Sequence, residues 1–175
     1  MSLRIDIPEI ATDRLVLRGP RLADIPAWTA FLGSERARFV GGPLDAETAW
    51  RVFATISGHW LLRGYGAFVF ALRGDDRAIG WAGAWHPAGW PACELTYTLW
   101  DPDLEGRGLA AEAARAARAF LQGLGIGRLM SYVDPANIRS VRLAERLGAE
   151  RDTAGPPARF PQAIAFRHPA PERAA

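Results

Sequence analysis

Lysine is absent from this 175-residue chain, so all 21 of its Lys and Arg residues are arginine. Without lysine the chain can form no Schiff base with a carbonyl substrate, and it cannot build a lysine-dependent phosphate loop. The net charge of +2 is small, and the arginines are scattered along the chain. The sequence therefore gives no indication of nucleic-acid binding.

Cysteine and long apolar runs are almost as scarce. A single cysteine, Cys93, excludes an internal disulfide and fits a reducing compartment. The first eight residues lack the apolar core of a signal peptide, and no run approaches the ~20 apolar residues of a membrane span. No cluster of cysteine and histidine suggests a metal site. We expect a cytoplasmic protein that binds neither a metal ion nor a membrane.

The composition is that of an ordinary globular domain, with 49% apolar and 23% charged residues. No internal repeat or linker divides the chain. We therefore expect a single domain over residues 1–168, followed by a flexible tail over residues 169–175. Seven tryptophans are many for this length, and four have the spacing of core residues: Trp28, Trp50, Trp60 and Trp81.

The hydrophobic pattern predicts strands and helices in a mixed order. Strands are expected over residues 14–18, 67–73, 78–85, 93–100, 128–133 and 162–167. Helices are expected over residues 24–32, 46–62 and 109–122, with a short one between 134 and 148. The hairpins imply antiparallel pairing, whereas the strand–loop–helix–strand unit at 93–133 implies one parallel crossover. The predicted fold is α+β, with a mainly antiparallel sheet of about six to seven strands and helices on both faces.

A glycine loop connects the 93–100 strand to the alanine-rich helix. Gly106 and Gly108 let the backbone approach a ligand closely. The helix that begins near Leu109 directs unpaired N–H groups and its positive dipole end at the same point. Arg107, between the glycines, adds a charge that can pair with phosphate. The loop therefore indicates a phosphate site.

Three interpretations of this loop compete. Residues 106–111 satisfy the dinucleotide fingerprint G-x-G-x-x-A. However, about five residues separate the preceding strand from Gly106, and too little chain follows for two βαβαβ halves. In isolation, two glycines indicate only a tight turn into a helix. The third interpretation comes from a resemblance of the surrounding residues to a known family.

Residues 94–113 resemble the pyrophosphate-binding motif of the GNAT acetyltransferase superfamily. Residues 134–148 resemble its second motif, N-x-x-S-x-x-x-x-E-K-L-G. The segments 11–18 and 166–167 resemble the RimJ/RimL-type branch, so the resemblance runs from about Thr12 to Arg167. It implies a GNAT-like sheet that is splayed between the strands 94–100 and 128–133, with room there for the pantetheine arm of coenzyme A.

The resemblance implies that acetyl-CoA is the cosubstrate. The N–H groups that would bind its pyrophosphate belong to Glu105, Gly106, Arg107, Gly108, Leu109 and Ala110. Backbone amides near Leu99 and Trp100 would bind pantetheine, and a free amide there would polarise the thioester carbonyl. Asn137 would hold pantetheine through its side chain, cap the following helix, or do both.

Two positions depart from the family pattern. Glu105 is acidic where the family commonly has Gln, Arg or Trp, and we expect its side chain to face solvent. Ala144 stands where many members carry a tyrosine that reprotonates the thiolate. The resemblance therefore leaves Ser140 or water as the acid.

Glu94 is the predicted general base, because it begins the strand beside the thioester and shares one face with Thr96 and Thr98. The alternative is a charge at the rim of the site. Trp85 and Trp90 flank a loop near the place where the family's acceptor groove opens. They either line that groove or pack the loop.

The sequence thus predicts an acetyl-CoA-dependent N-acetyltransferase. It would move an acetyl group directly to a primary amine, on a protein N-terminus or a small molecule. The alternatives are a non-catalytic acyl-CoA-binding or regulatory module and, remotely, a dinucleotide-binding oxidoreductase. The chain would act as a monomer or a homodimer.

Overall fold

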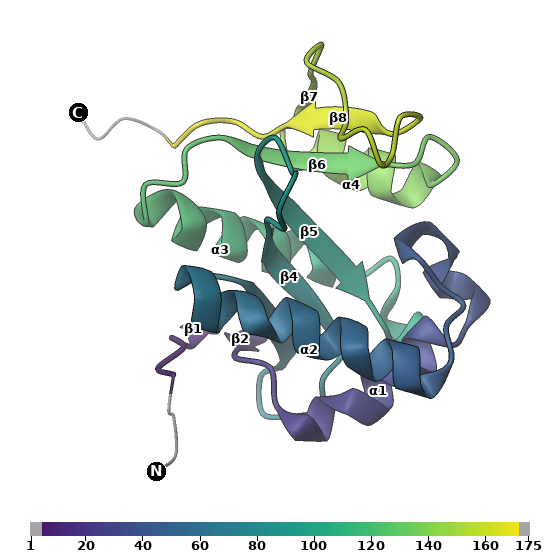
Figure 1. Cartoon of the computed structure of the whole chain (residues 1–175). Coiled ribbons are helices and arrows are strands. Elements are labelled where there is room, and N and C mark those ends of the chain that lie inside the picture. Colours follow the sequence, from purple (N-terminus) through teal and green to yellow (C-terminus); the bar gives the residue numbers. More distant parts are fainter. Residues whose placement is uncertain (1–4, 172–175) are drawn as a thin grey trace.

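The computed structural model describes residues 5–171, in which an eight-stranded sheet lies between two layers of helices (Figure 1). The strand order is β1-β2-β3-β4-β5-β6-β8-β7. The strands are β1 Ile10–Ala11, β2 Leu15–Arg18, β3 Ala67–Leu72, β4 Gly80–Trp85, β5 Cys93–Leu99, β6 Leu129–Val133, β7 Glu150–Arg151 and β8 Ile164–Arg167. The α-helices are α1 Ile25–Leu32, α2 Ala46–Arg63, α3 Leu109–Gly123 and α4 Ile138–Arg146. Short 3-10 segments occupy Leu22–Asp24, Glu35–Val40 and Pro102–Leu104.

All strand pairs of this sheet are antiparallel except β5 with β6, which are joined through α3 and pair in parallel. The predicted α+β fold is therefore confirmed. A doubly wound parallel sheet, which a dinucleotide-binding oxidoreductase of the Rossmann type would need, is excluded. The sheet has eight strands rather than six or seven, because β1 and β7 span two residues each and leave no periodic pattern.

Helices cover both faces of the sheet. Phe68 and Leu95 pack on one face against α3, in a cluster that includes Leu121. Val69 packs on the other face with Trp28 of α1 and with residues of α2. Phe68 and Val69 are consecutive but belong to different clusters, since side chains alternate along a strand. The two faces of the sheet therefore carry separate large cores, and two smaller clusters lie around β6 and β8.

Three of the four tryptophans predicted as core residues are buried, namely Trp28, Trp60 and Trp81. Trp50 is 52% exposed, so its prediction was wrong. The inner face of α2 is formed by Ala49, Phe53, Ile56, His59 and Trp60. Trp50 follows Ala49 by one residue, which rotates it away from the sheet.

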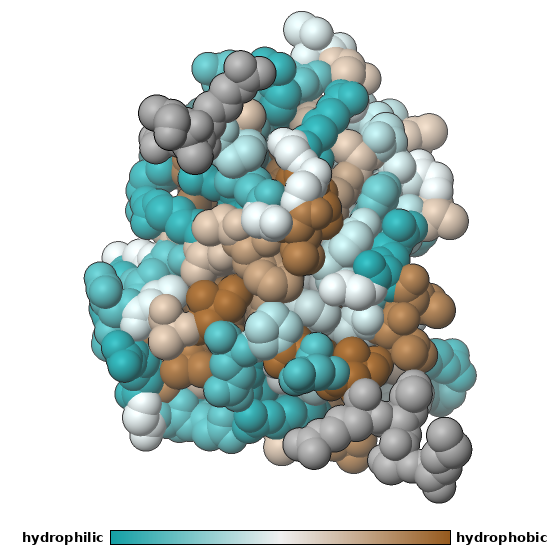
Figure 2. Space-filling model, turned by 90° about the vertical axis from the view of Figure 1, so that its left-hand side faces the viewer, coloured by the Kyte–Doolittle hydropathy of each residue, from teal (hydrophilic) through white to brown (hydrophobic). Residues whose placement is uncertain are grey.

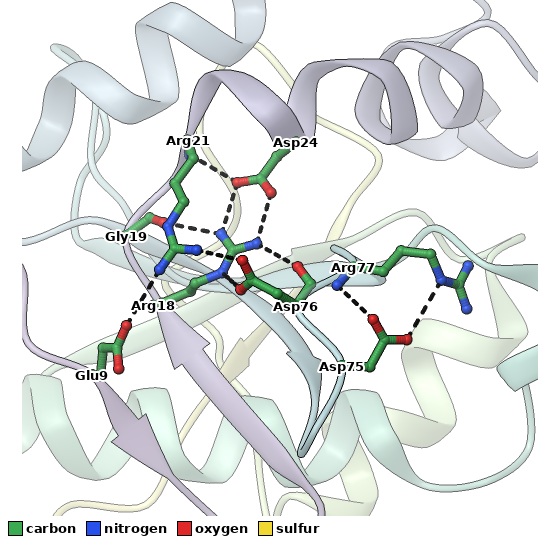
Figure 3. A network of polar contacts seen from close by, with 8 residues as sticks. All are labelled: Glu9, Arg18, Gly19, Arg21, Asp24, Asp75, Asp76 and Arg77. Carbon is green, nitrogen blue, oxygen red and sulfur yellow. Dashed lines mark hydrogen bonds and ion pairs between the residues drawn. The ribbon is translucent and has the colours of Figure 1, made fainter.

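An almost fully buried ion pair attaches the start of α1 to β2 (Figure 3). Arg18 Nη1 and Nη2 donate to the two carboxylate oxygens of Asp24, at 2.9 and 2.8 Å. The backbone N–H of Arg21 donates to the same carboxylate at 2.8 Å. Arg18 also donates to the carboxylate and the backbone oxygen of Asp76. Both buried charges are therefore paired and hydrogen-bonded, which is the condition for burying them.

Apolar side chains are exposed where α2 and α3 end. Leu62 of α2 is 83% exposed, and Leu124, which follows α3, is 52% exposed. Figure 2 views the molecule from this side and shows hydrophobic atoms gathered across its middle, between hydrophilic ones. The glycine loop lies at the opposite end of α3, so this apolar surface is separate from it.

The ends of the chain are described only in part. Residues 172–175 of the predicted tail, and residues 1–4 at the N-terminus, lie outside the described residues. The first residue of the predicted tail contacts α3, because the side-chain amide of Gln122 donates to the Pro169 carbonyl at 2.8 Å. None of the helices described over residues 5–171 has the length and apolar character of a membrane span.

Candidate active site

The parallel strands β5 and β6 pair over only two positions. Cys93 pairs with Leu129 and Glu94 with Met130, and Figure 1 shows β5 running away from β6 beyond them. Further along, the Ser131 hydroxyl of β6 donates to the Leu95 carbonyl of β5 at 2.6 Å. The predicted splay is therefore present. It leaves a V-shaped gap in the sheet, with Glu94 at its vertex.

The backbone of β5 presents a limited set of free groups to this gap. The Trp100 N–H donates to the Ile79 carbonyl at 2.7 Å, on the β4 side. Backbone groups of successive residues point to opposite edges of a strand, so the N–H groups of Tyr97 and Leu99 point toward the gap. The predicted role of the Trp100 amide is therefore wrong, because that amide is already paired. The amide of Leu99 remains a prediction, and Tyr97 joins it.

The glycine loop fits an anion. Gly106 and Gly108 have φ angles of 77° and 76°, in the left-handed region that favours glycine, and Gly108 caps α3. Within the described chain, no hydrogen bond is donated by the six backbone N–H groups of residues 106–111, which include Leu109 and Ala110. The predicted role of the Glu105 N–H is wrong, because that group donates to the Pro102 carbonyl at 3.2 Å. Free N–H groups of a turn and a helix N-terminus are the donors that bind a diphosphate. The residues present therefore suit the pyrophosphate of coenzyme A.

Arg14 holds this loop in place from the other end of the chain. Its Nη1 donates to the Arg107 carbonyl at 2.8 Å. Its guanidinium also pairs with Glu112 in the first turn of α3, with an Nη2–Oε2 distance of 2.6 Å. Thr12 donates to the same carboxylate at 2.6 Å. The segment before β2 thus fixes the loop and the start of α3 together.

Glu105 does not face solvent freely, and that expectation was wrong. Its Oε1 lies 2.7 Å from Nη2 of Arg36, and its Oε2 lies 2.7 Å from Nη1 of Arg139. Arg36 comes from the 3-10 segment after α1, and Arg139 comes from the first turn of α4. Arg36 also donates to the carbonyls of Leu99 and Trp100. These contacts join segments far apart in sequence, so no local pattern could indicate them.

Glu94 has the environment of a proton acceptor. Its side chain is partly buried, and Oε2 accepts a hydrogen bond from the Trp90 indole at 3.0 Å. Burial raises the pKa of Glu94 to about 7, and the hydrogen bonds from Trp90 and from the Tyr132 backbone oppose that rise. A carboxylate with a pKa near 7 is half ionised at neutral pH, which suits a general base.

Aromatic side chains surround Glu94. Trp90 packs edge-on against Phe160, with ring centroids 5.8 Å apart. Trp85 lies opposite Glu94 in the β4–β5 register and stacks on His59, with centroids 4.7 Å apart. The structure thus brings both predicted tryptophans to Glu94. Sequence reasoning missed Phe160, because it lies in a Pro-rich connection without periodicity.

The start of α4 carries the remaining predicted residues. Asn137 caps α4, since its Oδ1 accepts from the Ser140 N–H at 3.2 Å. The cap is therefore confirmed, while a contact of Asn137 with pantetheine stays a prediction. The Ser140 side chain is half-buried in the first turn of α4 and lies near the Tyr97 hydroxyl, whose pKa burial raises and Ser140 lowers. Ala144 is fully buried, in a cluster with Val133 and Phe166.

Comparisons with known proteins agree with this geometry. Residues 14–150 match the family model of the acetyltransferase (GNAT) domain. The crystal structure of the acetyltransferase from Agrobacterium tumefaciens str. C58 has a TM-score of 0.87 and 37% identity, over 96% of this chain and 98% of its own. RimL, a ribosomal L7/L12 alpha-N-protein acetyltransferase in complex with coenzyme A, has a TM-score of 0.71 over 93% of this chain and 98% of its own. Its identity of 16% limits that likeness to the fold.

A mycothiol acetyltransferase from Rhodococcus opacus (strain B4) is 29% identical over 107 residues, or 61% of this chain. The match covers 31% of that relative, so the chain spans about a third of its length. The family model, in contrast, covers most of this chain, including β5, the glycine loop and α4. The chain therefore belongs to the GNAT acetyltransferase family and has the fold of RimL.

Proposed function

We propose that this acetyltransferase transfers the acetyl group of acetyl-CoA directly to a primary amine, on a protein N-terminus or a small molecule. The observation that carries the proposal is the placement of Glu94. Its carboxylate, with a pKa raised to about 7, lies at the vertex of the gap between β5 and β6. A proton acceptor is thus held where the family's thioester would lie.

The chain offers a separate set of groups for each part of the cosubstrate. The free N–H groups of residues 106–111 suit the pyrophosphate, and Arg107 adds a positive charge beside them. The amides of Tyr97 and Leu99, with the Asn137 side chain, suit the pantetheine arm. Acetyl-CoA supplies a thioester that an amine can attack. A coenzyme A complex of RimL, which shares this fold, supports the choice of cosubstrate.

Transfer to an amine requires a neutral nitrogen, so a proton must leave it. Glu94 takes that proton, directly or through water. The Trp90 indole fixes Oε2 of the carboxylate by its hydrogen bond. The sulfur leaves with the electron pair of the C–S bond, and water returns a proton to it, directly or relayed by the Ser140 hydroxyl. Trp85 and Trp90 form a wall of the acceptor site, on the side of the sheet that faces α2.

An amine acceptor is stated in the name of RimL, an alpha-N-protein acetyltransferase of ribosomal L7/L12 that shares this fold. Another relative is a mycothiol acetyltransferase. We propose a primary amine for this chain, acting in the cytoplasm, with residues 1–168 as a single domain. The catalytic unit would be a monomer or a homodimer.

A panel of amines tests the proposal. Binding of acetyl-CoA is measured by calorimetry, and thiol release is measured with peptides of differing N-terminal residue and with small amines. Glu94→Gln should keep acetyl-CoA binding but lose roughly 10²–10⁴-fold in kcat/KM, with the ionisation near pH 7 removed from its pH profile. Glu145→Gln, an exposed carboxylate on α4, is the matched control and should behave as the wild type.

Two outcomes would contradict the proposal. An unchanged pH profile in Glu94→Gln would exclude Glu94 as the general base. Binding of acetyl-CoA without thiol release for any amine would instead support a non-catalytic acyl-CoA-binding module.

A further inference from the structure

We propose that the Tyr97 hydroxyl is reserved for the sulfur at the end of the pantetheine arm, to which it donates a hydrogen bond as the thiolate leaves. The proposal rests on the proposed function, because it needs coenzyme A in the gap between β5 and β6. It places a group that stabilises the leaving thiolate on strand β5. Many family members carry a tyrosine for this sulfur on the helix instead, at the position that Ala144 occupies here.

The Tyr97 hydroxyl is a buried polar group without a hydrogen-bond partner. Among the described residues, only two other buried side-chain atoms share this state, Trp81 Nε1 and His168 Nδ1. An unpaired buried hydroxyl costs free energy, so native structures keep few of them and those few call for an explanation. The Tyr97 hydroxyl would have a hydrogen-bond partner if coenzyme A occupied the gap between β5 and β6.

Tyr97 lies in the part of β5 that pairs with β4 but not with β6. It follows Glu94, the last residue of β5 that pairs with β6, by three positions. Its side chain packs against the cluster on the α3 face of the sheet, whereas the side chain of Glu94 alternates to the other face. The proton acceptor and the phenol thus lie on opposite faces of the gap. This arrangement lets an amine approach from one face while the sulfur leaves toward the other.

The polar groups near the Tyr97 hydroxyl do not satisfy it. The Ser131 hydroxyl donates to the Leu95 carbonyl at 2.6 Å, so the His168 Nε2 atom, 2.9 Å away, donates to Ser131. Burial lowers the pKa of His168 to about 4, which keeps its ring neutral. Ser131 therefore has no proton left to donate to the Tyr97 oxygen. The hydroxyls of Ser131 and Ser140 lie close enough to oppose the rise that burial gives the pKa of Tyr97, but neither has the geometry of a hydrogen bond with it.

The phenol stabilises the sulfur without giving up its proton. Burial raises the pKa of Tyr97, and the hydroxyls of Ser140 and Ser131 oppose that rise only in part. A thiol, with a pKa of about 8.5, is a stronger acid than a phenol, with about 10. The O–H bond of Tyr97 consequently stays intact. The sulfur keeps the electron pair of the broken C–S bond, and it takes its proton afterwards from solvent, directly or through the Ser140 hydroxyl, which regains a proton from water as it gives one up.

The substitution Tyr97→Phe tests this proposal without an acceptor amine. Coenzyme A is bound to each protein, and the ionisation of its thiol is followed by the ultraviolet absorbance of the thiolate. A hydrogen bond to a charged group is worth about 1.5–3 kcal/mol, so the acid dissociation constant of the bound thiol should fall about tenfold or more in Tyr97→Phe. The affinity for coenzyme A near neutral pH should stay unchanged. The midpoint of thermal unfolding should not fall, since the lost hydroxyl has no partner in the protein.

Tyr65→Phe is the matched control. The Tyr65 hydroxyl lies 3.2 Å from His86 Nδ1 and belongs to the segment between α2 and β3, so its loss should leave the thiol unaffected. An unchanged thiol acidity in Tyr97→Phe would overturn the inference. So would weaker coenzyme A binding with unchanged thiol acidity, which would assign the hydroxyl to the amides of the arm. A wild-type protein that does not bind coenzyme A would overturn the proposed function itself.

Discussion

Glu105 and Arg139 form an ion pair, 2.7 Å between Oε2 and Nη1, that connects the glycine loop to the first turn of α4. The other carboxylate oxygen of Glu105 pairs with Arg36 at the same distance. An acidic residue beside the proposed pyrophosphate site is thus held by two cations. The negative charge of Glu105 should oppose the binding of a pyrophosphate at the loop. Its two ion pairs join the loop to the 3-10 segment after α1 and to the start of α4.

Glu105→Gln should bind acetyl-CoA several-fold more tightly at low ionic strength. The substitution removes a negative charge next to the N–H groups of the loop and frees the charge of Arg139. Calorimetry at low and high salt should show the gain shrinking as salt screens it. The effect on stability should be about 0–1 kcal/mol, because Glu105 is 31% exposed and Arg139 is 80% exposed. Weaker binding at both salt concentrations would show instead that the ion pairs hold the loop in its binding conformation.

Glu94 should make the protein less stable as the pH rises from about 4.5 to about 7. Its pKa is raised from 4.5 to about 7 in the folded state, so over this range the folded chain holds a proton that the unfolded chain has released. The slope of unfolding free energy against pH from this group is therefore negative. Denaturant unfolding at pH 5 and pH 8 measures it. Glu94→Gln should gain stability relative to the wild type at pH 8, and an equal difference at both pH values would contradict the prediction.

Trp90→Phe should move the acid limb of the kcat/KM profile to higher pH. The Trp90 indole donates to the Glu94 carboxylate and lowers its pKa, so removing that donor lets burial raise the pKa further. Trp50→Phe, at an exposed position on α2, should leave the limb in place. A limb that stays in place in Trp90→Phe would mean that this indole does not tune the base.

Asp24→Asn should destabilise the protein by about 3–5 kcal/mol, because it leaves the buried guanidinium of Arg18 without its main counter-charge. Urea unfolding measures the change. Asp76 also pairs with Arg18, but its side chain is 73% exposed, so Asp76→Asn should cost much less. Similar losses for the two variants would show that burial does not set the strength of this network (Figure 3).

The elements that could be predicted from the sequence are those with a local signal. The continuous apolar runs of β3 and β4 predict buried strands, and the glycines before α3 predict its start. The resemblance to the family predicts where β5 and β6 separate. Trp50 was misassigned because a one-residue shift in helical phase moves a side chain from core to surface, and a short apolar pattern does not fix the phase.

The parts of the site that escaped prediction depend on distant contacts. Phe160 reaches Trp90, and Arg36 reaches Glu105, across many residues. Tyr97 was passed over because, along β5, it has the spacing of a core residue. Only the structure shows that its hydroxyl has no partner. Burial and pairing of a polar atom are properties of the packed chain, and no local pattern encodes them.

The narrow junction between β5 and β6 has a consequence for heat resistance. It divides the sheet into a five-stranded and a three-stranded part that share two residue pairs. Under the proposed function, an arm of coenzyme A along this seam would bridge the two parts and protect the Tyr97 and Leu99 amides from hydrogen exchange. A ligand that binds only the folded state stabilises it by mass action. The enzyme's tolerance of heat would then rise and fall with the supply of its own cosubstrate.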